Sequence, residues 1–234
     1  MKKIVITAAA FLLFICHAGP GSAATIDLWD YAFNIDGTLS YATTPAGGDL
    51  SGFDDWTGIG TISVEMTGAG DHYFVAFFDH EIDQDYNTFF QNEYGEAVGT
   101  AAAGQSWEID EPGYAFGDIY DNVPAGSLDN FNNVPTGWED DVSMAMGWDF
   151  YLESYQTATI SLILSTENPG SAFYLSQTDP DSEATIYFSS TLTISGDDPG
   201  TGDDNNNIVP EPSTIILFGI GLLGLAGAGR RKMG

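Results

Sequence analysis

The stretch that decides the fold is residues 184–194, which read ATIYFSSTLTI. Apolar and polar side chains alternate along it, so that Ile186, Phe188, Leu192 and Ile194 share one face and Thr185, Tyr187, Thr191 and Thr193 share the other. Alternation with a period of two, in a run rich in β-branched and aromatic residues, is typical of a strand with one buried face. These residues therefore predict a strand that packs one face on a hydrophobic core.

Three further segments carry the same signal, namely residues 59–66, 72–78 and 157–165. Glycine, proline, asparagine and aspartate mark turns between such segments, at residues 67–70, 168–170 and 179–181. A short helix could fit within residues 84–103, but the helical period of 3.6 is not sustained anywhere between the two ends of the chain. The pattern predicts an all-β fold, a single antiparallel β-sandwich of jelly-roll type over residues 25–195.

The positive charges lie only near the two ends of the sequence. The five basic residues are Lys2, Lys3, Arg230, Arg231 and Lys232, whereas all 34 Asp and Glu fall between residues 27 and 211. The segment between the basic groups therefore cannot form a Lys or Arg salt bridge. It also cannot neutralise phosphates, which excludes nucleic acid as a partner.

The first 24 residues predict a secretory signal peptide. Lys2 and Lys3 precede an apolar run, and small residues follow it, so cleavage is expected after Ala23 or Ala24. The alternative of a transmembrane anchor is disfavoured, because a span needs about 20 apolar residues. Cys16 suggests a lipoprotein signal as another alternative, but the residues before it are larger than the small residues that such a signal requires. Cys16 is the single cysteine, so the body can have neither a disulfide nor a catalytic thiol.

The last 39 residues divide into a linker and an apolar tail. Residues 196–208 are rich in Gly, Asp and Asn, and predict a flexible acidic linker. Residues 209–234 begin with Pro210, Glu211 and Pro212, continue without charge to residue 229, and reach the basic residues Arg230, Arg231 and Lys232. Residues 213–229 would form a helix of about 25 Å, close to the thickness of a membrane core. The basic cluster should stay in the cytoplasm by the positive-inside rule.

This tail resembles the PEP-CTERM sorting signal of Gram-negative bacteria, in which a Pro-Glu-Pro motif, a short apolar span and a basic cluster follow in that order. The resemblance implies recognition by an exosortase and cleavage near Pro210, Glu211 and Pro212. It also implies a transient inner-membrane anchor with a periplasmic body, followed by transfer to the cell surface or to an exopolysaccharide matrix. The three motif residues would then be a substrate site for another enzyme.

The densest acidic run is the candidate metal site of the sequence. Asp79, Glu81, Asp83 and Asp85 alternate with other residues, and carboxylate oxygens in such a loop could bind Ca²⁺. The run lacks the glycine and the final glutamate that an EF-hand needs. The alternative is a solvated acidic loop after a strand that ends at residue 78. No other cofactor is predicted.

Residues 107–122 mix carboxylates with aromatic rings, as a sugar-binding site does. Because the chain has 34 acids, a pair at the spacing for glycoside hydrolysis would arise by chance. His72 and His80 are expected to be structural or surface residues. The sequence therefore favours an exported, exosortase-processed, non-enzymatic protein with a structural or interaction role. The alternatives are a carbohydrate- or Ca²⁺-binding adhesion module and, less favoured, a secreted glycan hydrolase.

Overall fold

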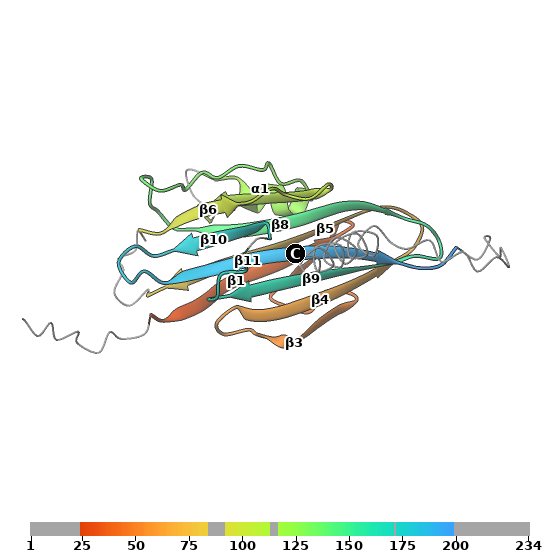
Figure 1. Ribbon diagram of the computed structural model, residues 1–234, viewed down its shortest axis with the longest axis horizontal. Helices are drawn as coiled ribbons and strands as arrows, with labels where there is room; N and C mark the ends of the chain where they lie inside the picture. The colour runs from red at the N-terminus through yellow and green to blue at the C-terminus, as the bar shows by residue number, and fades with distance from the viewer. Residues whose placement is uncertain (1–23, 84–91, 113–116, 171, 199–234) are drawn as a thin grey trace, which may run out of the picture. The chain divides into compact units, whose positions relative to one another are not determined.

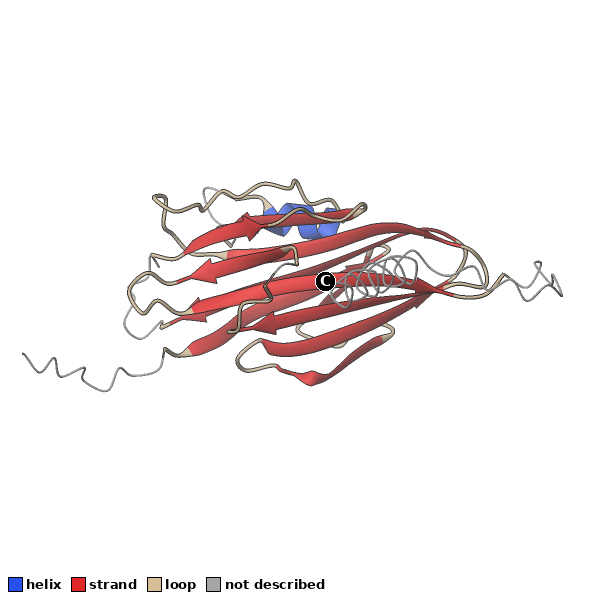
Figure 2. Ribbon diagram, in the orientation of Figure 1, coloured by secondary structure: helices blue, strands red, loops and turns tan. Residues whose placement is uncertain are grey.

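The computed structural model describes residues 24–83, 92–112, 117–170 and 172–198, which form 11 strands and one short helix. Figure 2 shows that strands make up nearly all of the regular structure. The strands belong to two sheets, and every pair of neighbouring strands within them is antiparallel. The prediction of an antiparallel β-rich fold is confirmed, while the jelly-roll type stays a prediction.

The first sheet has five strands. Its order is β2 (Thr38–Tyr41), β1 (Ile26–Ile35), β5 (Gly70–Ile82), β8 (Ser143–Leu152) and β7 (Gln105–Asp110). The second sheet has six strands. Its order is β3 (Gly48–Asp54), β4 (Ile59–Thr67), β9 (Thr157–Ser165), β11 (Thr185–Ser195), β10 (Tyr174–Thr178) and β6 (Tyr94–Val98). In Figure 1 the strands of both sheets run along nearly the same direction, as in an aligned sandwich.

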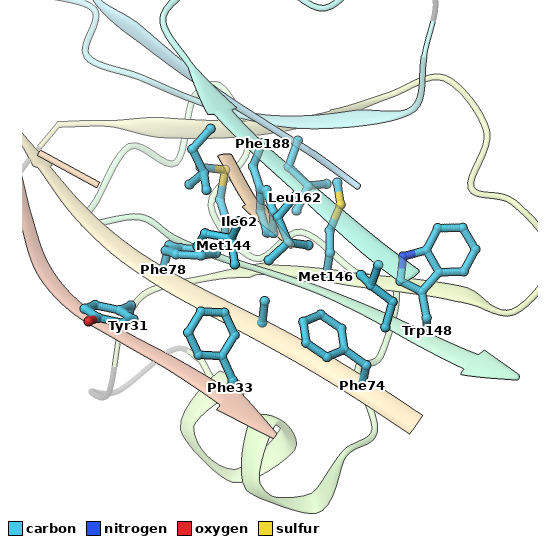
Figure 3. Close-up of a cluster of buried hydrophobic side chains, with 14 of the residues drawn as sticks. Tyr31, Phe33, Ile62, Phe74, Phe78, Met144, Met146, Trp148, Leu162 and Phe188 are labelled. Atoms are coloured by element: carbon cyan, nitrogen blue, oxygen red, sulfur yellow. The ribbon is translucent and has the colours of Figure 1, made fainter. Parts of the chain in front are cut away.

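The hydrophobic core lies between the two sheets. Phe78 on β5 and Phe188 on β11 meet edge to face, with ring centroids 5.2 Å apart. Figure 3 shows aromatic, aliphatic and methionine side chains around this contact, among them Phe33, Ile62 and Met144. The two sheets are thus held together by interdigitated apolar side chains.

Most of the predicted strand faces are confirmed. Ile62, Val64 and Met66 on β4 are buried, as are Ile160, Leu162 and Leu164 on β9. On β11 the burial of Ile186 and Phe188 is confirmed, but Ile194 is 40% exposed. The inner face of β11 becomes polar at Ser190, whose Oγ accepts hydrogen bonds from Trp148 Nε1 (3.0 Å) and Gln105 Nε2 (3.1 Å). The apolar stripe therefore ends earlier than the sequence pattern predicts.

A second, smaller apolar cluster covers the outer face of the first sheet. Ile119 and Val123 of helix α1 (Ile119–Ala125) pack with Val75, Phe77 and Ala145, together with Ala32 and Leu128. The prediction of a helix within residues 84–103 is wrong for residues 94–98, which form β6. These residues pair with β10, which a helix could not do. The helix α1 occupies a later segment.

Candidate functional site

The acidic run after residue 78 is part of a strand. Strand β5 continues to Ile82 because β1 pairs with it up to Ile26, whereas its pairing with β8 ends at Asp79 and Ser143. The expectation of a solvated loop at this point is therefore wrong. Residues 79–82 pair with β1 on one side, and their side chains alternate between the two faces of the sheet.

Asp79 and Glu81 lie on the outer face, the face that also carries Phe77. Asp141, two residues before the start of β8, joins them, so that one carboxylate oxygen of each of the three residues lies within 4.8 Å of the others. We call Asp79, Glu81 and Asp141 the acidic cluster. Asp30 and Asp27 of β1 stand opposite Asp79 and Glu81 in the strand register. Five carboxylates thus gather at one end of the first sheet.

Each residue of the acidic cluster has one buried oxygen without a hydrogen-bond partner. Asp79 is 2% exposed and Glu81 is 6% exposed. Asp79 Oδ1, Glu81 Oε2 and Asp141 Oδ1 are buried and accept no hydrogen bond from the described part of the chain. Burial, reinforced by the neighbouring carboxylates, raises the pKa of Asp79 well above its usual value, that of Glu81 to about 7 and that of Asp141 to about 6. Holding negative charge here therefore costs free energy.

The inner side of the same strand end carries a buried polar network. Glu93 Oε1 accepts a hydrogen bond from the backbone N–H of Ile82 (3.0 Å). Gln177 Nε2 donates to Glu93 Oε2 and to the backbone oxygen of His80 (2.7 Å). His80 Nε2 lies 3.2 Å from the carbonyl oxygen of Gly58, and burial lowers the His80 pKa to about 4. The network joins β5 to the second sheet and holds His80 as a structural residue.

In a second group of three acids, unlike in the acidic cluster, a hydrogen-bond donor contacts the carboxylates. Glu108, Asp118 and Asp129 also bring carboxylate oxygens within 4.8 Å of one another. Here Asn122 Nδ2 donates to both oxygens of Glu108 (3.1 Å each) and to Asp118 Oδ1 (3.0 Å). The side-chain amide thus occupies the space between the carboxylates. Burial raises the pKa of Glu108 to about 8, which keeps this group largely neutral at pH 7.

Asp110 organises the start of helix α1. Its Oδ2 accepts hydrogen bonds from the backbone N–H groups of Asp118 (2.7 Å) and Ile119 (3.1 Å), and its Oδ1 accepts one from Asn133. Asp118, at the N-cap position, makes no capping hydrogen bond with its own side chain. A buried aspartate eight residues earlier therefore supplies the cap.

The residues that suggested a sugar site have structural contacts where the structure describes them. Trp107 packs against Phe173, with ring centroids 6.3 Å apart, and Tyr120 packs against Phe77 at 5.3 Å. Glu108 and Asp110 are fully buried. The two remaining aromatic residues of the segment, Tyr114 and Phe116, lie outside the described residues.

The other predicted site residues fall in three places. Asp83 is not part of the acidic cluster, because its Oδ1 accepts hydrogen bonds from the backbone N–H (2.7 Å) and the hydroxyl (3.2 Å) of Thr25. Ala24 packs at the margin of the core. The rest lie outside the described residues: Ala23, Asp85, Pro210, Glu211, Pro212, Arg230, Arg231 and Lys232. No helix in the described ranges is long and apolar enough to cross a membrane.

Asp141 is the site residue that sequence reasoning missed. It lies about 60 positions from Asp79 and Glu81, and only the pairing of Asp79 with Ser143 brings it to them. A sequence signal existed in Asp140-Asp141, two acids directly before an apolar run at residues 142–148. That signal marks a strand start but does not indicate which strand lies beside it.

Comparison with known proteins identifies one segment of the chain. No curated protein matches the sequence, and no solved structure matches the fold. Residues 209–232 match the PEP-CTERM protein-sorting motif. The match spans the Pro-Glu-Pro residues, the apolar run and the basic cluster. The chain therefore carries a PEP-CTERM protein-sorting motif at residues 209–232, joined to an antiparallel β-rich body.

Proposed function

We propose that this chain is an exported surface protein that an exosortase processes at Pro210-Glu211-Pro212. The sorting motif at residues 209–232 carries this proposal, because PEP-CTERM motifs are the signals that exosortases recognise. The basic residues Arg230, Arg231 and Lys232 would hold the tail in the inner membrane until cleavage. The signal peptide of residues 1–24 would start the export, and the acidic linker of residues 196–208 would give the enzyme access.

We further propose that the β-rich body has a structural or interaction role at the cell surface or in an exopolysaccharide matrix, and is not an enzyme. Three observations support this. Residues 25–208 contain no cysteine. His72 Nδ1 lies 2.7 Å from Asp36 Oδ2, and His80 is buried against Gly58. The buried carboxyl of Asp110 is engaged in capping a helix. The two histidines and Asp110, which could otherwise act as bases, therefore hold the fold.

The test of sorting is a substitution of the motif in cells that contain an exosortase. Replacing Pro210, Glu211 and Pro212 by alanine should leave the protein in the inner-membrane fraction, whereas the wild type is released to the surface. Replacing Asn205, Asn206 and Asn207 by alanine is the matched control, because it changes three neighbouring residues outside the motif. Normal surface release of the Pro-Glu-Pro variant would refute the proposal, as would equal release of the wild type from cells lacking exosortase.

A further inference from the structure

The acidic cluster of Asp79, Glu81 and Asp141 combines proximity with unmet bonding capacity. Each residue contributes one oxygen that is buried and without a hydrogen-bond partner in the described residues, and the three side chains bring oxygens within 4.8 Å of one another. Buried polar atoms are almost always partnered, so three unpartnered carboxylate oxygens in one place require a cause. A bound cation would supply it.

The described part of the chain offers no basic side chain at the cluster. No Lys or Arg occurs between residues 4 and 229. His72 contacts Asp36 near the opposite end of β5, and His80 points to the inner face of the sheet, where it contacts Gly58. The groups that face the cluster from the neighbouring strand β1 are the acids Asp27 and Asp30. A cation at the cluster would therefore come from solution and not from the described residues.

The chemistry of the donor set favours one kind of ion. All available ligands are carboxylate oxygens, which suit hard divalent cations, whereas zinc prefers nitrogen and sulfur. Ca²⁺ binds oxygen at about 2.3–2.6 Å, so two of its ligands can lie up to about 5 Å apart. Mg²⁺ binds at about 2.0–2.1 Å, which limits that separation to about 4.2 Å. Oxygens that lie within 4.8 Å of one another are compatible with Ca²⁺, which also accepts the irregular, flexible arrangements of oxygen ligands that Mg²⁺ does not.

We propose that Asp79, Glu81 and Asp141 bind one Ca²⁺ ion on the outer face of the first sheet, with Asp27 and Asp30 of β1 at the margin of the site. The ion would join β5 to the segment that enters β8. It would also remove the repulsion between carboxylates that the sheet holds together. The site differs from the contiguous run expected from the sequence, because Asp83 binds Thr25 and Asp141 takes its place. The proposal does not depend on sorting by exosortase.

The test compares thermal unfolding of the full-length protein, purified in detergent, in EDTA and in CaCl₂ at matched ionic strength. Exported Ca²⁺ modules have Kd values of about 10⁻⁴–10⁻³ M. At a Ca²⁺ concentration 10–100 times Kd, the Tm of the wild type should rise by roughly 3–10 °C. Calorimetric titration with CaCl₂ should give one site per chain. An unchanged Tm in Ca²⁺ would overturn the proposal.

Two variants separate ion binding from a structural role. Asp79→Asn and Asp141→Asn should lose the Ca²⁺-dependent rise in Tm, and in EDTA both should be as stable as the wild type or more stable, because each removes a repelling charge. Asp71→Asn is the matched control, since it removes one exposed carboxylate from the same strand eight residues away and should keep the full rise. A full Ca²⁺ response in Asp79→Asn or Asp141→Asn would refute the assignment. So would loss of the response in Asp71→Asn.

Discussion

Removing the Asp110 carboxylate should destabilise the protein by an amount that its contacts allow us to work out. Asp110 accepts hydrogen bonds from the backbone N–H groups of Asp118 and Ile119 and from the Asn133 amide. In Asp110→Ala all three donors lose their acceptor. The buried N–H of Ile119 should cost about 1–3 kcal/mol, whereas the other two donors, which lie nearer to solvent, should cost about 0.5–1 kcal/mol each.

One term acts in the other direction. Burial raises the pKa of Asp110, so removing this carboxylate relieves the cost of holding a charge in a buried position. We take this relief as about 1 kcal/mol. The net loss expected for Asp110→Ala is therefore about 1–4 kcal/mol of unfolding free energy. Asp110→Asn keeps one acceptor oxygen for the helix and should lose about half as much.

Urea denaturation of the two Asp110 variants and of the wild type measures these losses. Asp118→Ala is the control, because Asp118 occupies the N-cap position without capping the helix through its side chain, and it should cost no more than about 0.5 kcal/mol. Hydrogen exchange of the amides of helix α1 (Ile119–Ala125) should accelerate in Asp110→Ala. A loss below about 1 kcal/mol in Asp110→Ala, or an equal loss in Asp118→Ala, would refute the remote-cap reasoning.

Two further predictions concern the charge and the core of the body. The pKa of Glu108 is raised to about 8 in the folded state. Between about pH 4.5 and 8 the folded protein therefore keeps a proton on Glu108 that the unfolded chain has released, and the unfolding free energy falls as the pH rises through this range. Glu108→Gln should therefore make this fall less steep by about 0.5–1 kcal/mol per pH unit, which is below the limit of about 1.4 kcal/mol per pH unit for one unscreened proton. Parallel pH profiles of the variant and the wild type would contradict this. Phe78→Ala should cost about 3–5 kcal/mol in urea denaturation, because it opens a cavity against Phe188 between the sheets. Trp138→Ala, at a ring that is 77% exposed, should stay within about 0.5 kcal/mol, and equal losses would contradict the assigned core.

The strands that sequence reasoning found are those in which burial follows a simple alternation. Strand β9 was predicted with its bounds, because Ile160, Leu162 and Leu164 alternate with smaller or polar residues and all three face the core. Strand β1 was not predicted. Asp27 and Asp30 interrupt its apolar pattern, and a bulge between Leu28 and Asp30 changes which side chains face inward. Such a shift cannot be detected from residue type alone.

The helix α1 escaped prediction because it is short and contains Pro124. Its C-terminal signal was present in Gly126, which has a φ of 70° in the left-handed region that suits glycine. Its cap comes from Asp110, which precedes it by eight residues or more and cannot be recognised by a local capping pattern. Seven helical residues are also too few to show a 3.6-residue period.

Two of the three residues of the acidic cluster belong to the run that the sequence analysis selected. Asp79 and Glu81 belong to the acidic run that the sequence analysis selected, but β5 extends through them, so they do not lie in a loop, and Asp83 contacts Thr25 instead. Asp141 comes from a distant segment, and only the register between β5 and β8 places it. Composition supplied the strongest physical argument for the site. A body without Lys or Arg has no side chain of its own to neutralise buried carboxylates.

The intact mass of the protein recovered from the cell surface tests the central claim most directly. Processing at both ends would leave a chain that lacks Lys2, Lys3, Arg230, Arg231 and Lys232, and therefore has no Lys or Arg at all. The account predicts a mass that corresponds to a chain starting near residue 24 or 25 and ending near Pro210, which trypsin does not shorten even after unfolding. A surface protein whose mass includes residues 230–232, and which trypsin shortens there, would contradict it.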